Sequence, residues 1–560
     1  MLEFSKIEEL KGISALKNKK LDLSVGVVQE NPIVGDVAGN LELATKSIDS
    51  LLSKRHPDII LFSEMFLTGY PPEDLLLRRD LYKKVEESLK SLATKYPQVP
   101  IVIGYPRIVD GNTYNCAGVL HEGKLVYEYK KQELPNYKVF DEKRYFSAGS
   151  DPCTFSIKGI KLSITICEDI WHKKAVKQAK EEGAKLILNL NASPFHLNKI
   201  KERREILYDH CKENNLSIVY VNQVGGQDEL VFDGNSMAVT PDERNWTLLN
   251  GFKTQVDCFD FTMNDKGDLE LAETKQPTID DEKESLLNAL VLGTKDYVEK
   301  NNFNGAIIGS SGGIDSALTA VIATKALGPE RVKTFMMPFK FTADISQEDA
   351  SSLALNLGIE HKEIRIHEIF DSFDETLDLQ NIVDPSDKTK ENLQSRIRGV
   401  ILMAISNKIG SLVLTTGNKS ETAVGYSTLY GDTAGGFAVL KDVPKTLVYE
   451  LAKYINSIKE IIPQRIIDRP PSAELAPNQK DSDSLPDYEV LDQIIEEYVE
   501  KDMSIDEISK KGLDKKEVER IIKLIDRNEY KRRQGPPGVR ITNRGFGKDR
   551  RYPITNKFSQ

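Results

Sequence analysis

The pattern of hydrophobic and polar residues changes along the chain and predicts two domains of different organisation. From Leu21 to Val27, apolar residues alternate with small or polar ones, which predicts a β-strand. Short apolar runs with helical patterns between several of them follow at residues 59–62, 101–103, 162–166, 186–190 and 218–221. The first half is therefore expected to be an α/β domain with a large central sheet system.

In the second half, strands and helices alternate regularly. Strands are expected at residues 306–308, 332–337, 364–366 and 412–414, with helices at 346–357 and 392–405 between the later ones. A further helix follows the first of these strands and ends near Gly328. Repeated strand–helix units predict a doubly wound parallel sheet that binds ligands at the carboxyl ends of its strands. The loops after residues 308 and 414 should share that edge.

Polarity marks the expected domain boundaries. Residues 1–20 are polar with helical spacing and predict an N-terminal helical segment, and residues 21–262 form the first domain. Residues 263–284 are polar and acidic, which favours a linker, and residues 285–560 form the second domain. A chain of 560 residues exceeds one comfortable core, in agreement with this division.

Composition narrows the class of protein. Hydrophobic residues make up 39% of the chain and charged residues 29%, as in a soluble globular protein. A net charge of −10 argues against nucleic acid as a partner, although the basic run at 531–533 is either a solvated helix end or a phosphate contact. The N-terminus lacks a signal-peptide pattern and no apolar stretch is long enough to span a bilayer, so we expect a cytoplasmic protein without a membrane partner.

The five cysteines are odd in number and form no CxxC pair, so they indicate neither a disulfide framework nor a zinc site. All five lie in the first half of the chain. This asymmetry is consistent with two unrelated modules joined end to end.

Residues 309–316, Gly-Ser-Ser-Gly-Gly-Ile-Asp-Ser, carry the sharpest chemical signal. A strand, a tight glycine turn and a helix N-terminus together make an anion site from backbone N–H groups and the helix dipole. The lysine of the usual triphosphate loop is missing. Asp315 instead suits a magnesium ion held against a departing pyrophosphate. The alternative is an ordinary Gly-Ser turn before a helix. The Ser-Gly-Gly-x-Asp-Ser pattern resembles the PP-loop ATP pyrophosphatases, which cleave ATP between its α- and β-phosphates and adenylate an acceptor.

A second chemistry is expected in the first half. Glu64 and Cys167 each follow an apolar run, and Lys131 lies in a polar segment between them. A thiolate nucleophile, a carboxylate that takes and returns the proton, and an ammonium that holds the oxyanion are sufficient for an amidase. Each residue alone is weak support for an amidase. A cysteine at a strand end is more often a small buried hydrophobic residue, a glutamate there often begins a helix, and a lysine in a polar segment is usually solvated.

The residues around these three side chains strengthen the interpretation. Ser63-Glu64 before Thr-Gly-Tyr-Pro at 68–71, Lys131-x-x-Leu-Pro and Cys167-Glu-Asp-x-Trp all resemble the nitrilase, or carbon–nitrogen hydrolase, superfamily over roughly residues 21–260. The resemblance implies an α-β-β-α sandwich, with Cys167 as nucleophile, Glu64 as proton acceptor and Lys131 as oxyanion stabiliser. It also implies that Glu142 is a second glutamate near the site.

The order of the two modules resembles the glutamine-dependent NAD synthetases over essentially the full chain. Further matching segments lie at residues 391–396, 416–421, 425–432, 441–449 and 530–537. Ammonia-only relatives typically carry lysine where this chain has Leu429, so one contact with the substrate phosphate is expected to differ.

The resemblance implies a reaction with two sites. Glutamine is hydrolysed to glutamate and ammonia at the first; at the second, the carboxylate of deamido-NAD is adenylated by ATP, and ammonia displaces AMP to give NAD. NAD is then a product, and no tightly bound organic cofactor is expected. Because ammonia in water is mostly protonated, we expect a shielded internal passage for it and a homo-oligomer.

The same resemblance assigns binding roles. Glutamine would be bound by Tyr137, Ser193 and Lys199; deamido-NAD by Asn392, Glu421 and Lys531; and Mg²⁺ by Asp315 and Glu421. ATP would be bound by Gly309, Ser310, Ser311, Gly312, Gly313, Ile314, Asp315, Ser316, Thr416, Lys445 and Ser472.

Two alternatives stay open on the sequence. One is an amidase-fed PP-loop synthetase that acts on a different carboxylate or carbonyl acceptor. The other is a nucleotide-sensing protein without catalysis, against which the presence of Glu64, Lys131, Cys167 and Asp315 argues.

Overall fold

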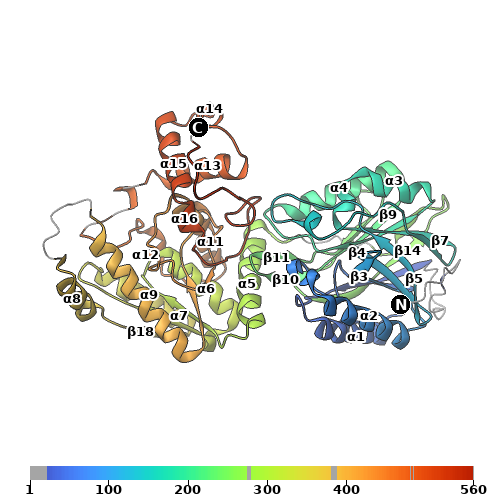
Figure 1. Cartoon of the computed structure of the whole chain (residues 1–560), viewed down its shortest axis with the longest axis horizontal. Helices are drawn as coiled ribbons and strands as arrows, with labels where there is room; N and C mark the ends of the chain where they lie inside the picture. Colours follow the sequence, from blue (N-terminus) through green and yellow to red (C-terminus); the bar gives the residue numbers. More distant parts are fainter. Residues whose placement is uncertain are drawn as a thin grey trace. The chain divides into compact units, whose positions relative to one another are not determined.

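The structure, a computed structural model, describes residue 10 and residues 22–273, 279–379, 387–477, 479, 481–483 and 485–558. The chain divides into two compact units. The first contains Met1–Gln227 and Val231–Asp281, and the second contains Asp228–Leu230 and Glu282–Gln560. Figure 1 shows the helices and strands of both units.

The first unit contains two large sheets. The seven-stranded sheet has the order β15 (Leu269–Leu271), β14 (Gln255–Met263), β1 (Leu23–Gln29), β2 (Ile59–Leu61), β3 (Ile101–Val109), β4 (Asn112–His121) and β5 (Lys124–Lys130). The six-stranded sheet has the order β13 (Trp246–Leu248), β12 (Met237–Val239), β9 (Ser217–Asn222), β8 (Leu186–Asn191), β7 (Ile160–Ile166) and β6 (Thr154–Ile157). Strands β10 (Val224–Gln227) and β11 (Leu230–Asp233) form a two-stranded sheet.

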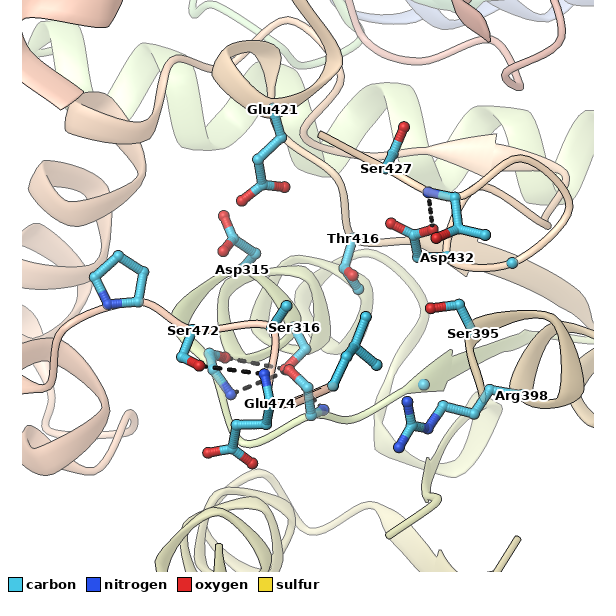
Figure 2. Close-up of a pocket in the computed structure, with 18 of the residues that line it drawn as sticks. Asp315, Ser316, Ser395, Arg398, Thr416, Glu421, Ser427, Asp432, Ser472 and Glu474 are labelled. Carbon is cyan, nitrogen blue, oxygen red and sulfur yellow. Dashed lines mark hydrogen bonds between the residues drawn. The ribbon is translucent and has the colours of Figure 1, made fainter. Parts of the chain in front are cut away.

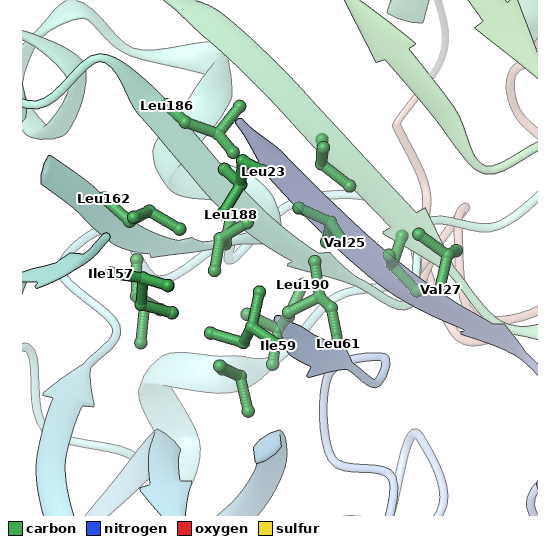
Figure 3. Packing of buried hydrophobic residues seen from close by; sticks show 14 of the residues in the cluster. Leu23, Val25, Val27, Ile59, Leu61, Ile157, Leu162, Leu186, Leu188 and Leu190 are labelled. Atoms are coloured by element: carbon green, nitrogen blue, oxygen red, sulfur yellow. The ribbon is translucent and has the colours of Figure 1, made fainter. Parts of the chain in front are cut away.

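The two large sheets bury a shared hydrophobic core. Leu23, Val25 and Val27 of β1 belong to one cluster with residues of β7 and β8, including Leu162 and Leu188 (Figure 3). Burying such side chains contributes about 1.5–3 kcal/mol each. Helices α1 (Val37–Lys54) and α2 (Arg79–Lys95) contact the seven-stranded sheet, and α3 (Lys173–Glu181) and α4 (Lys199–Asn214) contact the other (Figure 1). This arrangement confirms the expected α-β-β-α sandwich.

The period-two pattern of β1 has a physical reason, although both faces of the strand are buried. Its apolar residues face the other sheet, and small residues occupy the alternate positions. A Cβ atom on Gly26 would lie 2.5 Å from Leu51 Cδ2 of α1. The glycine therefore allows α1 to pack closely on the outer face of the strand.

The second unit is built on a five-stranded parallel sheet with the order β18 (Glu360–Glu363), β17 (Val332–Met336), β16 (Ala306–Gly309), β19 (Leu412–Thr415) and β20 (Phe437–Ala438). Strands β17 and β18 follow β16 on one side of it, and β19 and β20 then lie on its other side. The direction in which strands are added therefore reverses between β16 and β19. Ligands bind at such a reversal in parallel α/β sheets. The doubly wound parallel sheet expected from the sequence is confirmed.

The helices of this unit are α5 (Glu282–Lys300), α6 (Ile314–Leu327), α7 (Asp344–Leu357), α8 (His367–Thr376), α9 (Thr389–Ile409), α10 (Lys419–Val424), α11 (Lys445–Ile458) and α12 (Gln464–Asp468). A helical region with its own hydrophobic cluster follows, formed by α13 (Tyr488–Ile495), the π-helical turn η7 (Glu496–Glu500), α14 (Ile505–Ser509), α15 (Lys515–Arg527) and α16 (Glu529–Arg532). None of the described helices combines the length and apolarity needed to cross a membrane.

Two expectations about the elements were wrong. The strand predicted at 364–366 lies at Glu360–Glu363, where polar side chains are tolerated because β18 is an edge strand. The linker predicted at 263–284 contains β15, whose residues Leu269 and Leu271 are buried on either side of exposed Glu270, and α5 begins already at Glu282.

The N-terminal helical segment predicted at 1–20 lies outside the described residues apart from Leu10. That residue is buried and forms a parallel β-bridge with Ile157. Its described contact is therefore with the edge of the six-stranded sheet.

Candidate active sites

Three buried charged side chains meet in the first unit. Lys131, which follows β5, donates to Glu64 Oε1 and to Glu142 Oε1 at 2.8 Å each. Glu64 also accepts hydrogen bonds from Asn115 Nδ2 at 2.7 Å and from the backbone N–H of Ala192 at 3.0 Å. Two carboxylates therefore share one ammonium in a site that is closed to water, where such interactions are strong. Burial raises the pKa of Glu142 to about 7 against the opposing effect of Lys131.

Cys167 lies directly after β7, at the start of the 3₁₀ turn Cys167–Trp171. Its φ of 42° is in the left-handed region, and such backbone strain is concentrated at functional sites. Burial raises the pKa of the Cys167 thiol well above its ordinary value, and the carboxylate of Glu64 adds to this effect while the ammonium of Lys131 opposes it. The thiol is therefore protonated at neutral pH and needs a base to become a nucleophile.

Asp169 is a site residue for which the sequence analysis predicted no role. Its Oδ1 accepts from the backbone N–H groups of Gln132 at 3.0 Å and Glu133 at 2.8 Å. Its Oδ2 accepts from the backbone N–H of Ile166 at 2.9 Å and from Tyr129 Oη at 2.8 Å. One carboxylate thus ties the segment after Lys131 to the turn that carries Cys167. Burial raises the pKa of Asp169 to about 6.

The predicted glutamine contacts lie around this turn. Tyr137, which is half exposed, donates to Glu168 Oε1 at 2.9 Å. The ammonium of Lys199 lies 3.9 Å from the centre of the Trp171 ring, a favourable cation–π distance. Tyr137 and Lys199 therefore each contact the turn that begins at Cys167.

Ser193, the third predicted glutamine contact, is hydrogen-bonded to buried residues of the first unit. Arg203, fully buried, donates through Nε to Ser193 Oγ at 3.2 Å and pairs with Asp233 at 2.8 Å. The Ser193 N–H donates to Asn222 Oδ1 at 2.9 Å. No role was predicted for Arg203 and Asp233. They lie on α4 and at the end of β11, where no local sequence motif marks them.

The second unit has a cavity of about 550 Å³ at the carboxyl ends of β16 and β19. Ile308 pairs with Leu414, so the loops that follow the two strands start at the same level and both line the cavity, as expected. Of the predicted ATP and deamido-NAD contacts, the lining includes Gly309, Ser310, Ser311, Gly313, Ile314, Asp315, Ser316, Asn392, Thr416, Glu421, Lys445 and Ser472.

Two carboxylates of the cavity lining, those of Asp315 and Glu421, point toward each other (Figure 2). Asp315 accepts a hydrogen bond from Asn418 Nδ2 at 2.9 Å and pairs with the ammonium of Lys445, which also lies 3.1 Å from Glu421 Oε1. Burial raises the pKa of Glu421 to about 7, against the opposing effect of Lys445. Burial would lower the pKa of Lys445, but the two carboxylates outweigh it and raise the pKa.

The two carboxylates fit a magnesium ion. Mg²⁺ in proteins commonly takes one or two carboxylates and completes its shell with water and substrate phosphates. Among the described residues, no group of three or more His, Cys, Asp or Glu side chains is arranged to hold a metal ion. Asp315 and Glu421 therefore offer the number of carboxylates that such an ion takes when phosphates complete its shell.

Two predicted residues lie behind the cavity wall. Gly312 is not part of the lining; its φ is +74°, and an added Cβ would lie 2.3 Å from the Ser346 carbonyl oxygen. Lys531 is also absent from the lining and donates to the carbonyl oxygens of Gly425 and Ser427 at 2.8 Å each. Lys531 therefore supports a wall segment that does line the cavity.

Further charged side chains line the cavity without having been predicted, among them Arg398, Asp432 and Asp481. Figure 2 labels the first two. Arg398 donates through Nε to the Met337 carbonyl oxygen at 3.0 Å and points its guanidinium into the cavity, and burial lowers its pKa to about 10. Burial raises the pKa of Asp432 to about 6. Asp481 accepts from Tyr488 Oη at 2.8 Å.

The signal for Arg398 was present in the sequence. Asn392, Ser395, Arg398 and Leu402 recur at helical spacing on α9, and all four line the cavity. The helical spacing from Asn392 therefore predicts that Arg398 lies on the same face of α9.

Comparisons with known proteins agree with two sites. The model of the carbon–nitrogen hydrolase family matches residues 24–253, and that of the NAD synthase family matches residues 286–535. The chain is 45% identical over 535 residues to the glutamine-dependent NAD(+) synthetase of Acinetobacter baylyi, covering 95% of this chain and 98% of that protein. It is 44% identical over 575 residues to that of Aquifex aeolicus, covering 96% and 100%. The solved structure of glutamine-dependent NAD+ synthetase from Acinetobacter baumannii in complex with ADP is 43% identical, with a TM-score of 0.77 over 95% of this chain and 98% of that one.

Proposed function

The chain belongs to the family of glutamine-dependent NAD(+) synthetases, and we propose that its two units divide the reaction of this family between them. The overall reaction is the ATP-dependent amidation of deamido-NAD to NAD with nitrogen from glutamine, which makes the chain a ligase of NAD biosynthesis. The first unit releases ammonia from glutamine, and the second consumes it. The observation that carries this division is that each unit has its own buried cluster of opposite charges, Glu64–Lys131–Glu142 in one and Asp315–Lys445–Glu421 in the other.

In the first unit, Cys167 attacks the side-chain amide carbon of glutamine. Its thiol is protonated because burial raises its pKa, so Glu64 accepts the proton during the attack and returns it to the leaving ammonia. Lys131, held by Glu64 and Glu142, donates to the oxyanion of the tetrahedral intermediate. Water then releases glutamate from the thioester. Tyr137, Ser193 and Lys199 bind the substrate.

In the second unit, the loop 309–316 and the N-terminus of α6 bind the phosphates of ATP. The carboxylate of deamido-NAD attacks the α-phosphate and pyrophosphate leaves. Adenylation turns a poor electrophile into one with a good leaving group, and ammonia then displaces AMP. Thr416, Lys445 and Ser472 contact ATP, whereas Asn392 and Glu421 contact deamido-NAD. Lys531 acts on deamido-NAD through the wall segment that it holds.

Magnesium would be held by Asp315 and Glu421, and it supplies charge neutralisation for the departing pyrophosphate. The opposed carboxylates in Figure 2 support this role. Lys445 contacts both of them and is placed to keep them in position.

Assembly and location extend the proposal. Two exposed apolar side chains one turn apart on α9, Val400 at 69% and Met403 at 39% exposure, support a homo-oligomer. The net charge of −10 supports an enzyme without a nucleic-acid partner, and we propose that it works in the cytoplasm. Light scattering after gel filtration tests the oligomeric state.

A product assay tests the function. The chain is incubated with ATP, Mg²⁺, deamido-NAD and either glutamine or ammonium, and NAD, AMP, pyrophosphate and glutamate are measured. We expect NAD, AMP and pyrophosphate in equal amounts with both nitrogen sources, and glutamate only with glutamine. Absence of NAD with both sources, or amidation of another acceptor in preference to deamido-NAD, would contradict the proposal.

A further inference from the structure

The segment 418–421 at the start of α10 presents two faces. The first face meets the cavity, where Asn418 donates to Asp315 and Glu421 pairs with Lys445 at 3.1 Å. The second face turns into the protein. There Ser420 Oγ accepts from the backbone N–H of Lys445 at 2.8 Å, and Lys419 is fully buried. Three side chains of this segment therefore contact Asp315 or Lys445, which line the cavity, and the fourth, Lys419, lies in the interior of the protein.

Lys419 is the most heavily bonded of the four. Its ammonium lies 2.7 Å from Glu500 Oε1, 2.7 Å from Thr542 Oγ1 and 2.9 Å from Asp442 Oδ1. Burial would lower the pKa of Lys419, but the two carboxylates outweigh it and raise the pKa. The cluster joins four parts of the chain that are distant in sequence. Removing one member of such a buried network leaves charges without partners, which is strongly unfavourable.

Asp442 extends the network to the segment that precedes α11 and to the segment 541–542. Its Oδ2 accepts from the backbone N–H groups of Ile541 at 2.9 Å and Thr542 at 2.8 Å, and from Thr542 Oγ1 at 2.8 Å. The next residue along the chain, Val443, accepts from the backbone N–H of Lys419 at 2.9 Å. Lys445 begins α11 two residues later. The same cluster therefore anchors the starts of α10 and α11, the helices that carry Glu421 and Lys445.

Thr542 lies beyond the part of the chain that the NAD synthase model matches, which ends at residue 535. The segment around Thr542 nevertheless supplies a hydroxyl and two N–H groups to the cluster. Part of the organisation of the cavity thus comes from outside the matched region.

We propose that Lys419 is a positioning residue of the adenylation site, which acts with Asp442 and Thr542 to set the places of Glu421 and Lys445. The inference rests on the proposed function, since it concerns how Mg²⁺ and ATP are held. Lys419 does not line the cavity and acts through its neighbours. A small displacement of either helix changes the separation between the carboxylates and the ammonium, and such misplacements weaken positioned binding strongly.

Two variants test the proposal. Lys419→Met keeps the length of the side chain and removes its charge, and Thr542→Val keeps the shape and removes one hydroxyl. NAD formation with saturating ammonium is measured against Mg²⁺ and ATP concentration, and binding of ATP with Mg²⁺ is measured by calorimetry. For Lys419→Met we expect the KM for ATP and the half-saturating Mg²⁺ concentration to rise roughly 10–100-fold. For Thr542→Val we expect a smaller rise in the same direction.

Lys300→Met is the matched control. Lys300 is a largely buried lysine of the same unit, but its ammonium pairs with Asp296 of its own helix, α5, at 3.3 Å. Its replacement is expected to leave the KM for ATP and the Mg²⁺ dependence unchanged. Hydrolysis of glutamine without ATP and deamido-NAD reports the first unit of each preparation, and the melting temperature of each variant reports the folding of the second unit, which carries the substitutions.

The outcomes are distinct. If Lys419 has only a structural role, its replacement lowers the fraction of active protein and therefore the apparent kcat, but leaves the KM for ATP and the Mg²⁺ dependence unchanged. That result in folded Lys419→Met overturns the proposal. If Lys419→Met does not fold, Thr542→Val decides, and unchanged Mg²⁺ dependence or failure to fold in that variant overturns the proposal as well. A wild-type chain that makes no NAD contradicts the proposed function instead.

Discussion

Cys167 belongs to the first unit alone, and its replacement separates the two sources of nitrogen. We expect Cys167→Ala to abolish NAD formation from glutamine, because no other group on the 3₁₀ turn can form the thioester. NAD formation from ammonium should stay within about twofold of wild type, since the cavity of the second unit has its own charged groups. The measurement is NAD formed with each source at matched melting temperature. Loss of both activities in a folded variant contradicts the two-site proposal.

Asp315 has the complementary role in the second unit. Asp315→Asn should lower NAD formation from both nitrogen sources by roughly 100-fold or more, because a neutral amide cannot balance a magnesium ion on departing pyrophosphate. Asparagine has the shape of aspartate and can still bond Asn418, so the loop should stay folded. Pyrophosphate release with ammonium present is the check. A near-normal rate would remove Asp315 from the metal site.

The raised pKa of Glu142 predicts that the first site is sensitive to pH. Burial raises its pKa to about 7, so its carboxylate is charged above pH 7 and takes up a proton as the pH falls through 7. The protonated form loses the ion pair with Lys131, and a charge-assisted hydrogen bond contributes about 1.5–3 kcal/mol. We expect glutamine hydrolysis to decline below about pH 7. Glu142→Gln should be roughly tenfold slower at pH 8 and lack this step.

Glu142→Asp serves as its control, because it retains a titratable carboxylate. Glutaminase rates between pH 5.5 and 8.5 on all three proteins are the measurement. If Glu142→Gln keeps the inflection of the wild type, another group is responsible for it.

Residues with a local sequence context could be predicted, and residues that act across the fold could not. Glu64, Lys131 and Cys167 stand at strand ends within short recognisable patterns, and the structure brings Glu64 and Lys131 within 2.8 Å of each other. Asp169 stands within the Cys167-Glu-Asp-x-Trp pattern, but the backbone N–H groups that it accepts from, those of Gln132 and Glu133, lie in another segment, so the pattern did not indicate its role. Arg203 donates to the Ser193 carbonyl oxygen from α4, where no local motif marks it.

At the scale of elements, several buried central strands were predicted, whereas the edge strand β18 was misplaced and the edge strand β15 was missed, as were the interior strands β4 and β14. Strands β1, β8 and β16 are buried, so their sequences are apolar and easily recognised. β18 is polar because one edge and much of its surface face solvent, and β15 is a three-residue strand within an acidic segment. The helical region α13–α15 was not predicted, although α15 is strongly amphipathic, with Val518, Ile521, Ile522 and Ile525 buried.

The loop between β16 and α6 depends on the backbone of Gly312. Its φ of +74° and the 2.3 Å approach of an added Cβ to the Ser346 carbonyl oxygen exclude a side chain. Gly312→Ala should therefore displace the loop and lower NAD formation from ammonium by roughly 100-fold, with weaker ATP binding by calorimetry. Gly358→Ala is the matched control, because Gly358 has a φ of +69° and nothing within 4 Å of an added Cβ.

The two variants separate strain from collision. A left-handed conformation costs alanine about 1–2 kcal/mol, so both variants should lose comparable stability from this source. Gly358→Ala should make NAD at the wild-type rate. Equal activity of both variants would show that the close approach at Gly312 does not matter for ATP.

At the scale of the whole molecule, each unit has its own sheets and core. The periodicity of the second half was enough to predict a doubly wound sheet, because each strand is followed by a helix of clear length. The sandwich of the first half followed only from the family resemblance. A strand buries apolar side chains both in a sandwich of two sheets and in one larger sheet. The hydrophobic pattern along each strand therefore does not distinguish these two architectures.

A chain that joins a glutaminase to a synthetase gains little if its ammonia escapes, because free ammonia is diluted and mostly protonated. We therefore expect ATP and deamido-NAD together to stimulate glutamine hydrolysis by roughly 5–150-fold, a coupling of about 1–3 kcal/mol. The ratio of glutamate released to NAD formed should then approach one. An added enzyme that consumes free ammonia should leave NAD formation from glutamine almost unchanged, whereas it suppresses NAD formation from a limiting amount of ammonium.

Glutamate and NAD are measured in parallel, with and without the substrates of the second unit. Asp315→Asn provides the internal comparison, because it retains the first site and impairs the second. If glutamine hydrolysis is indifferent to ATP and deamido-NAD in the wild type, and most of the ammonia reaches the scavenging enzyme, the two sites work independently. In that case the fusion of the two units serves only to produce them in equal amounts.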